Sequence, residues 1–108
     1  MLEDKVYSFL VSPKAREMLF EHATFLSQVS MKRAYELFDL FEEKATSLEI
    51  MPERCPQYIN PYIHSGKYRR LALGTYLLIL FQVIDSTVYI ELVIDVRADN
   101  NDILEMLK

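Results

Sequence analysis

The stretch KYRRLALGTYLLILFQVIDSTVYIELVID, residues 67–95, predicts β-strands in succession and decides the class of fold. Residues 67–73 carry aliphatic and aromatic side chains and end at Gly74-Thr75, a pair that favours a tight turn. Residues 76–84 are apolar at almost every position, which is typical of a strand that is buried on both faces. This strand is therefore expected inside a sheet rather than at its edge.

A second short turn, Asp85-Ser86, leads into residues 87–95, where apolar and polar positions alternate. Because alternate side chains of a strand lie on the same face, we expect one buried face made of Val88, Ile90, Leu92 and Ile94. Strands that are joined by very short turns pair antiparallel. The last third of the chain thus predicts a small antiparallel sheet.

Upstream of this sheet the sequence predicts a strand at residues 5–11 and then two helices. Ser12-Pro13 is a favourable start for the first helix, and Ser30 is the expected cap of the second. Apolar residues recur at helical spacing in both helices: Ala15, Met18, Leu19, His22, Phe25, Leu26 and Val29, then Ala34, Leu37, Phe38, Phe41, Ala45 and Leu48. With almost no linker between them, the helices should form an antiparallel hairpin.

The predicted fold class is therefore α+β, with the elements in the order β-α-α-β-β-β. We expect one domain, residues 1–108, in which the helical hairpin packs on one face of the antiparallel sheet. Phe25, Phe38, Phe41 and Phe81 have the spacing of core residues. Prolines 52, 56 and 61 predict an irregular connection before the sheet, and the tail from residue 100 favours a short last helix.

Composition excludes several classes of protein. The single cysteine, Cys55, allows neither an internal disulfide nor a thiolate metal site. The longest apolar run, residues 76–81, is too short to span a membrane, and the start of the chain lacks the pattern of a secretion signal. No glycine-rich phosphate loop or metal-ligand spacing is present. We expect a cytoplasmic protein with no metal, no cofactor and no membrane partner.

Charge is unevenly distributed along the chain. Its net charge is −4, yet residues 54–84 contain no acid and hold four of the 12 lysines and arginines: Arg54, Lys67, Arg69 and Arg70. A local basic region of this kind can bind an anion or an acidic partner in an acidic protein. The alternative is that these cations pair with acids from other parts of the fold.

The order of elements and several local motifs resemble the RelE/ParE family of toxins. The family's opening strand and Ser/Thr-Pro step correspond to Val6-Tyr7-Ser8-Phe9-Leu10-Val11-Ser12-Pro13-Lys14-Ala15. Its closing strands correspond to Tyr68-Arg69-Arg70-Leu71, Gly74-Thr75-Tyr76, Phe81-Gln82-Val83-Ile84-Asp85, Val88-Tyr89-Ile90 and Val93-Ile94-Asp95-Val96-Arg97-Ala98-Asp99. The resemblance covers essentially the whole chain, and the last third is its most specific part.

The resemblance implies a toxin of a type II toxin–antitoxin pair, as found in plasmid stabilisation systems. RNA-cleaving members surround the scissile phosphate with basic residues and a C-terminal tyrosine or histidine. Here Arg69, Arg70 and Arg97 match, but no tyrosine or histidine follows Tyr89, and Leu77 stands where an arginine is usual. The gyrase-inhibiting branch needs no catalytic set, so we expect a binding toxin, most similar to ParE, that inhibits DNA gyrase.

Two alternatives stay open at this stage. One is a ribosome-dependent mRNA endoribonuclease, with Arg69, Arg70, Arg97 and His64 in its site. The other is a non-toxic relative that acts as a protein-binding module. The partners expected are a cognate antitoxin and either gyrase or the ribosome with its mRNA. The resemblance implies that the antitoxin wraps a segment across the hairpin and the sheet. The sequence does not fix the oligomeric state, and a homodimer is compatible with it.

For target or antitoxin binding we select Lys67, Tyr68, Arg69, Arg70 and Arg97. Arg69 and Arg70 are neighbours on a strand, so their side chains should point to opposite faces. Each has a structural alternative: a solvated position, or an ion pair with Glu91. For Arg97 the structural alternative is an ion pair with Asp95 or Asp99. His22 lies on the helical stripe, where a hydrogen-bonded core histidine is a better interpretation than a ligand.

Overall fold

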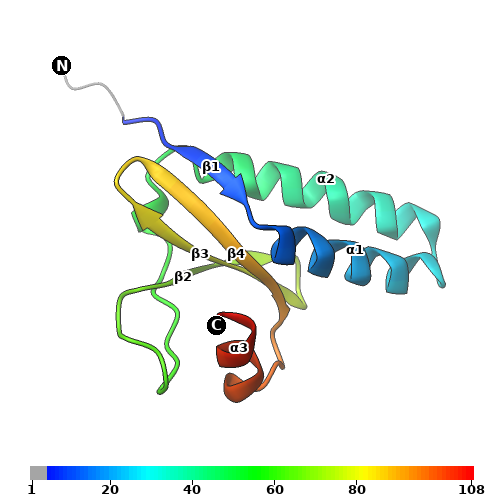
Figure 1. Cartoon of the computed structure of the whole chain (residues 1–108). Coiled ribbons are helices and arrows are strands. Elements are labelled where there is room, and N and C mark those ends of the chain that lie inside the picture. The colour runs from blue at the N-terminus through cyan, green and yellow to red at the C-terminus, as the bar shows by residue number, and fades with distance from the viewer. Residues whose placement is uncertain (1–4) are drawn as a thin grey trace.

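The computed structural model describes residues 5–108, and within them the chain forms a four-stranded sheet, three α-helices and one 3-10 helix (Figure 1). In order these are β1 (Ser8–Val11), α1 (Pro13–Ser27), α2 (Met31–Ser47), η1 (Pro52–Arg54), β2 (Arg69–Leu73), β3 (Leu77–Ile84), β4 (Thr87–Asp95) and α3 (Asn100–Met106). The α+β class and the predicted order are confirmed, including the short last helix. Residues 1–4, part of the segment considered for a secretion signal, lie outside the described residues.

The sheet has the strand order β1-β4-β3-β2. The two predicted hairpins, β2–β3 and β3–β4, are antiparallel, as expected from their short turns. β1 joins the sheet parallel to β4, with Ser8 opposite Thr87. The sheet is therefore mixed rather than wholly antiparallel. No short turn connects β1 to β4, so turn length could not fix their relative direction.

β4 contains a β-bulge. On either side of the bulge, the alternation of side chains between the two faces of the sheet is reversed. Leu80 pairs with Leu92 and Phe81 pairs with Ile90, so Glu91 is an extra residue on β4. Such an insertion shifts the alternation of side chains by one position. Val88, Ile90 and Val93 consequently pack on the hairpin side, whereas Leu92 and Ile94 pack on the other side. The prediction that Val88, Ile90, Leu92 and Ile94 share one face was wrong.

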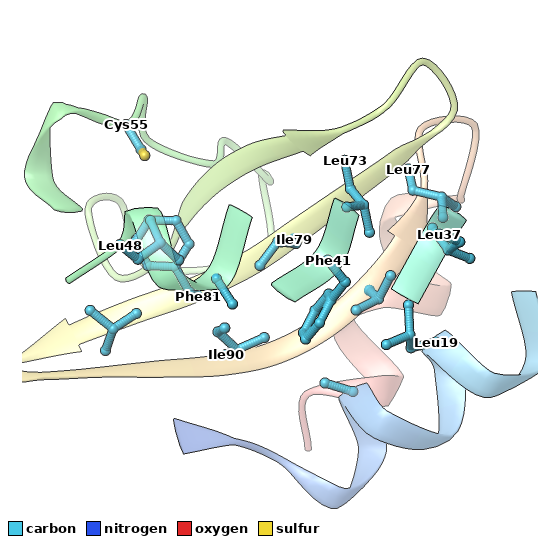
Figure 2. Packing of buried hydrophobic residues seen from close by; sticks show 14 of the residues in the cluster. Leu19, Leu37, Phe41, Leu48, Cys55, Leu73, Leu77, Ile79, Phe81 and Ile90 are labelled. Carbon is cyan, nitrogen blue, oxygen red and sulfur yellow. The ribbon is translucent and has the colours of Figure 1, made fainter. Parts of the chain in front are cut away.

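The main hydrophobic core lies between the helical hairpin and one face of the sheet. Phe41 projects from α2 towards Ile79 and Ile90, and Phe81 beside them is fully buried (Figure 2). A smaller core occupies the other face, where Leu80, Leu92 and Ile94 pack with Ile103 of α3 and with Tyr68. One face of the sheet is thus covered by α1 and α2 together, and the other by the much shorter α3 (Figure 1).

The predicted helix starts are confirmed. The hydroxyl oxygen of Ser12 accepts a hydrogen bond from the Ala15 amide, and Pro13 occupies the first turn of α1. The same Ser12 hydroxyl donates to the carbonyl oxygen of Glu91 at 2.8 Å. Ser12 therefore caps α1 and also attaches the helix to the bulge of β4. Ser30 caps α2 through the Arg33 amide in the same way.

The apolar stripe of α1 is buried only along part of its length. Ala15, Leu19 and Ala23 are buried, whereas Phe25 is 70% exposed and Val29 is 78% exposed. The assignment of Phe25 to the core was wrong. Phe25 lies in the last turn of α1 and Val29 lies between the two helices, at the end of the hairpin that extends beyond the sheet in Figure 1. Among residues 5–108, no helix is both long and apolar enough to cross a membrane.

Candidate functional site

A groove opens beneath the protruding end of the hairpin. Its cavity of about 700 Å³ lies between the two helices, the β2–β3 turn and the end of β4. The apolar part of its lining consists of Phe25, Leu26, Leu37, Leu40, Leu73, Tyr76 and Leu77. Tyr76 is 69% exposed, so Tyr76 and Phe25 form two exposed aromatic edges around a floor of leucines. This is the kind of surface that takes apolar side chains from a partner.

The turn that forms one wall of the groove is held in place by backbone geometry. Gly74 has φ +68°, a conformation that side chains of L-residues disfavour. The amide of Val96, just after β4, donates to the carbonyl oxygen of Tyr76 at 2.9 Å. The turn and the end of β4 are therefore linked, and both contribute to the groove.

The charged rim of the groove contains His22, Arg33, Glu36, Asp95 and Arg97. Asp95 accepts hydrogen bonds from Arg97 Nε and Nη2, each at 3.0 Å, and from the Arg97 amide at 2.8 Å. These bonds hold the pKa of the Asp95 carboxyl at about 2 and raise the pKa of Arg97. Arg97 thus forms the ion pair that was its structural alternative, although its side chain remains 82% exposed at the rim.

His22 reaches the sheet from α1. Its Nε2 lies 3.2 Å from the carbonyl oxygen of Val93, a hydrogen-bond distance when Nε2 carries the proton. Half-buried and bonded in this way, it is the structural histidine that the helical stripe indicated. Among residues 5–108 there is no group of three or more histidine, cysteine, aspartate or glutamate residues placed to hold a metal ion.

Two of the four cations in the basic segment have structural roles. Arg54 donates to the carbonyl oxygens of Ile50 and Met51 and to the Ser47 hydroxyl, which secures the chain just after α2. Arg69 lies opposite Phe81 on the hairpin side of the sheet, and its Nη1 donates to the carbonyl oxygens of Cys55 at 2.7 Å and Glu53 at 3.2 Å. Both arginines therefore fasten the irregular connection to its surroundings.

Arg70 points the other way. It pairs with Leu80, whose side chain belongs to the core beneath α3, so Arg70 lies on the α3 side of the sheet. It is exposed, and its side chain forms no salt bridge or hydrogen bond within residues 5–108. Glu91, its suggested partner, instead accepts a hydrogen bond from Gln82 at 2.7 Å. The opposite orientation of Arg69 and Arg70 is as predicted, and Arg70 is the one that remains available.

Lys67 and His64 lie on the loop that precedes β2. Lys67 Nζ is 5.3 Å from the centre of the Tyr68 ring, and that ring is almost completely buried against α3. His64 is exposed on the same loop and lines a small cavity with Lys67. The selected residues thus do not form one site. Arg97 borders the groove, Arg69 faces the hairpin side, and Lys67, Tyr68, Arg70 and His64 belong to the α3 side.

The groove itself was not predicted. Phe25 was assigned to the core and Tyr76 to a strand, because both fit the apolar pattern of their segments. Phe25 lies in the last turn of α1, and the sequence carries no signal that its side chain faces away from the core. Cys55 lies in the irregular connection between α2 and β2 and is buried. Burial raises the pKa of its thiol, which therefore stays protonated at neutral pH.

No protein-family model matches this sequence, and no curated protein matches it. Among solved structures, it is similar to a chain described as "Chromosomal ParDE TA system from P. aeruginosa", a toxin–antitoxin system. The TM-score is 0.67 at 15% sequence identity, and the match covers 86% of this chain and 99% of that chain. A match of this quality at such low identity establishes the fold. It confirms the ParE-like fold that the sequence motifs indicated.

Proposed function

We propose that this protein is the toxin of a type II toxin–antitoxin module and that it acts by binding its target rather than by cleaving RNA. The observation that carries this proposal is the ParE-like fold combined with an open apolar groove at the end of the hairpin. An exposed groove with a leucine floor favours a protein that is covered by a partner during part of its life. The location we expect is the cytoplasm.

The antitoxin is the partner we assign to the groove. Antitoxins of this class fold on binding, and a folding segment can place apolar side chains against Leu37, Leu40 and Leu73. Phe25 and Tyr76 would enclose such a segment from both sides. Since both are exposed in the unbound chain, they supply the aromatic contact area that dominates many interfaces.

The target is assigned to the α3 side of the sheet, where Arg70 is free of partners within residues 5–108 and Lys67 and Tyr68 lie close to it in sequence. The target we propose is DNA gyrase. Two observations favour binding over RNA cleavage: Arg69 and Arg97 already have carbonyl and carboxylate partners, and no histidine or tyrosine follows Tyr89 in the sequence. Cleavage of RNA needs a general base, a general acid and free cations around one phosphate.

The test is induction of the chain alone in a bacterial host. We expect growth arrest with DNA-damage signalling, no new transcript ends, and inhibition of supercoiling when the purified chain is added to gyrase. New 5′ ends at codon positions in translated messages would overturn binding in favour of the ribonuclease. If the folded protein is present and growth does not arrest, the proposal that this protein is a toxin is wrong.

The groove has its own test. Co-expression of the neighbouring reading frame should relieve the arrest caused by the wild-type chain. With Phe25→Ala and Tyr76→Ala combined, the arrest should persist but relief should be lost, because the antitoxin no longer binds. Tyr35→Ala is the matched control, since Tyr35 is 63% exposed on α2 and does not line the groove. Equal relief for all three proteins would show that the antitoxin binds elsewhere.

A further inference from the structure

A second, smaller cavity lies on the opposite side of the molecule from the hairpin. Its volume is about 200 Å³, and it is formed between the loop before β2 and the end of α3. Its lining consists of Tyr62, Ile63, His64, Lys67, Tyr68 and, from the end of the chain, Leu104, Leu107 and Lys108. None of these residues lines the groove, so the two sites are separate.

The loop that forms this cavity is held by a buried asparagine. Asn60 is 5% exposed, and its Nδ2 donates to the carbonyl oxygen of Asn100 at 3.1 Å and to the Tyr58 hydroxyl at 3.3 Å. Its Oδ1 accepts from the amide of Tyr62 at 3.0 Å. A buried polar group with all of these bonds fixes the loop to α3. The cavity is therefore formed before any ligand arrives.

The walls of the cavity suit an aromatic ring. Leu104 and Leu107 are half-buried and provide an apolar surface, while Tyr62 is 59% exposed at the edge. Within residues 5–108 the Tyr62 hydroxyl has no hydrogen-bond partner, so this ring is free to adjust. A volume of about 200 Å³ is smaller than the roughly 300–1,000 Å³ of typical ligand cavities and has room for one ring system.

Two lysine ammonium groups lie at the mouth of the cavity, and one of them is paired with a carboxylate. Lys67 makes no salt bridge within residues 5–108, and its ammonium group is held near the cavity by the face of Tyr68. Lys108 is paired with Glu105 at 2.9 Å, which uses one of its three ammonium hydrogens. His64 is exposed beside them. Two ammonium groups around a ring-sized cavity are complementary to a phosphate attached to a ring.

We propose that this cavity binds a nucleotide, with its base against Tyr62 and the leucines and its phosphate at Lys67 and Lys108. Lysine ammonium groups bind phosphate as point charges, and bases stack on exposed tyrosines whatever their identity. An acidic peptide would use the lysines but would leave the aromatic and leucine walls without a complementary group. The nucleotide can be free or part of a single strand, since both present the same base and phosphate.

Titration of the full-length protein with AMP, adenosine, inorganic phosphate and an oligoadenylate, followed by NMR, tests this site. We expect AMP to shift the resonances of the loop and of α3, and to bind about tenfold more tightly than either adenosine or phosphate. Tyr62→Ala should weaken AMP binding by about five- to 100-fold, the range for loss of one stacked base. Lys67→Ala should weaken binding of both AMP and phosphate.

The matched controls are Tyr35→Ala and Lys14→Ala, two exposed positions on the helical hairpin that should leave binding unchanged. Melting temperatures of all variants establish that each is folded. Oligoadenylate that binds much more tightly than AMP identifies a single strand as the ligand, and equal affinity identifies the free nucleotide. The proposal is overturned if AMP causes no shifts at millimolar concentration, if phosphate binds as well as AMP, or if the controls weaken binding equally.

Discussion

The two faces of the sheet differ in how completely they are covered. The hairpin face is covered by α1 and α2 along most of its length, and its core includes Phe41, Ile79, Phe81 and Ile90 at 9% exposure or less. The α3 face is covered by a helix of only seven residues. Stability is therefore concentrated on the hairpin face, because it buries most of the apolar side chains. The α3 face keeps polar and charged groups such as Arg70 accessible, and it is the surface that we assign to the target.

The two neighbouring arginines of β2 differ in the same way, because one lies on the well-covered face and the other on the more open face. Arg69, on the hairpin face, donates hydrogen bonds to two carbonyl oxygens of the irregular connection. Arg70, on the α3 face, has no side-chain partner within residues 5–108. A single step along a strand thus separates a structural cation from an available one.

The largest effect is expected in the core of the hairpin face. Phe41→Ala should lower the free energy of unfolding by about 3–5 kcal/mol, because it removes a buried ring and leaves a cavity against the sheet. Phe38→Ala should cost less, since Phe38 is only half-buried and packs edge-on against the exposed Phe20. Denaturant melts measure both values. A cost for Phe38 equal to that for Phe41 would contradict the burial difference.

A smaller and more local effect is expected beneath α3. Ile103→Ala should cost about 2 kcal/mol, the low end for buried aliphatic truncations, because α3 is short and can detach without unfolding the sheet. Hydrogen exchange is the decisive measurement. The amide hydrogens of α3 should exchange faster, while those of β3 and β4 keep their protection. Uniform acceleration across the sheet would mean that the two faces unfold as one unit.

The smallest effect concerns the ion pair at the groove. Asp95 has a pKa of about 2 in the folded protein against an ordinary 3.8, so its contribution is complete above about pH 4 and is lost as the pH falls towards 2. Asp95→Asn should therefore lower the melting temperature slightly at pH 7 and much less at pH 2. The effect should be small because the pair is exposed. An equal difference at both pH values would rule out this carboxylate as the cause.

Local patterns predicted the elements but not their faces. The strand boundaries of residues 87–95 were correct, because alternation and turn residues are local signals. The reversal of face at Glu91 was missed, although the consecutive apolar residues Leu92, Val93 and Ile94 were a sign of it. The parallel pairing of β1 was missed as well, because it joins segments about 80 residues apart without a short turn.

The candidate site was harder to predict for the same reason. Residue type made Arg69, Arg70 and Arg97 candidates, but the backbone carbonyls that bind Arg69 and the carboxylate that binds Arg97 are brought near only by the fold. The orientation of Arg69 relative to Arg70 followed from strand geometry alone. The groove depends on where the hairpin extends past the sheet, and helical periodicity does not contain that information.

Alanine substitutions of Arg69 and of Arg70, compared side by side, distinguish the structural arginine from the one that is available to a partner. Growth inhibition on induction and the melting temperature of the purified protein are measured for both variants. We predict that Arg70→Ala abolishes inhibition and leaves the melting temperature within a few degrees. We predict that Arg69→Ala lowers it by about 4–8 °C, as for the loss of roughly 1 kcal/mol of bonding, while inhibition persists. Full growth inhibition by Arg70→Ala, or equal effects of the two substitutions, would show that Arg70 does not contact the target and that the two arginines do not differ in role.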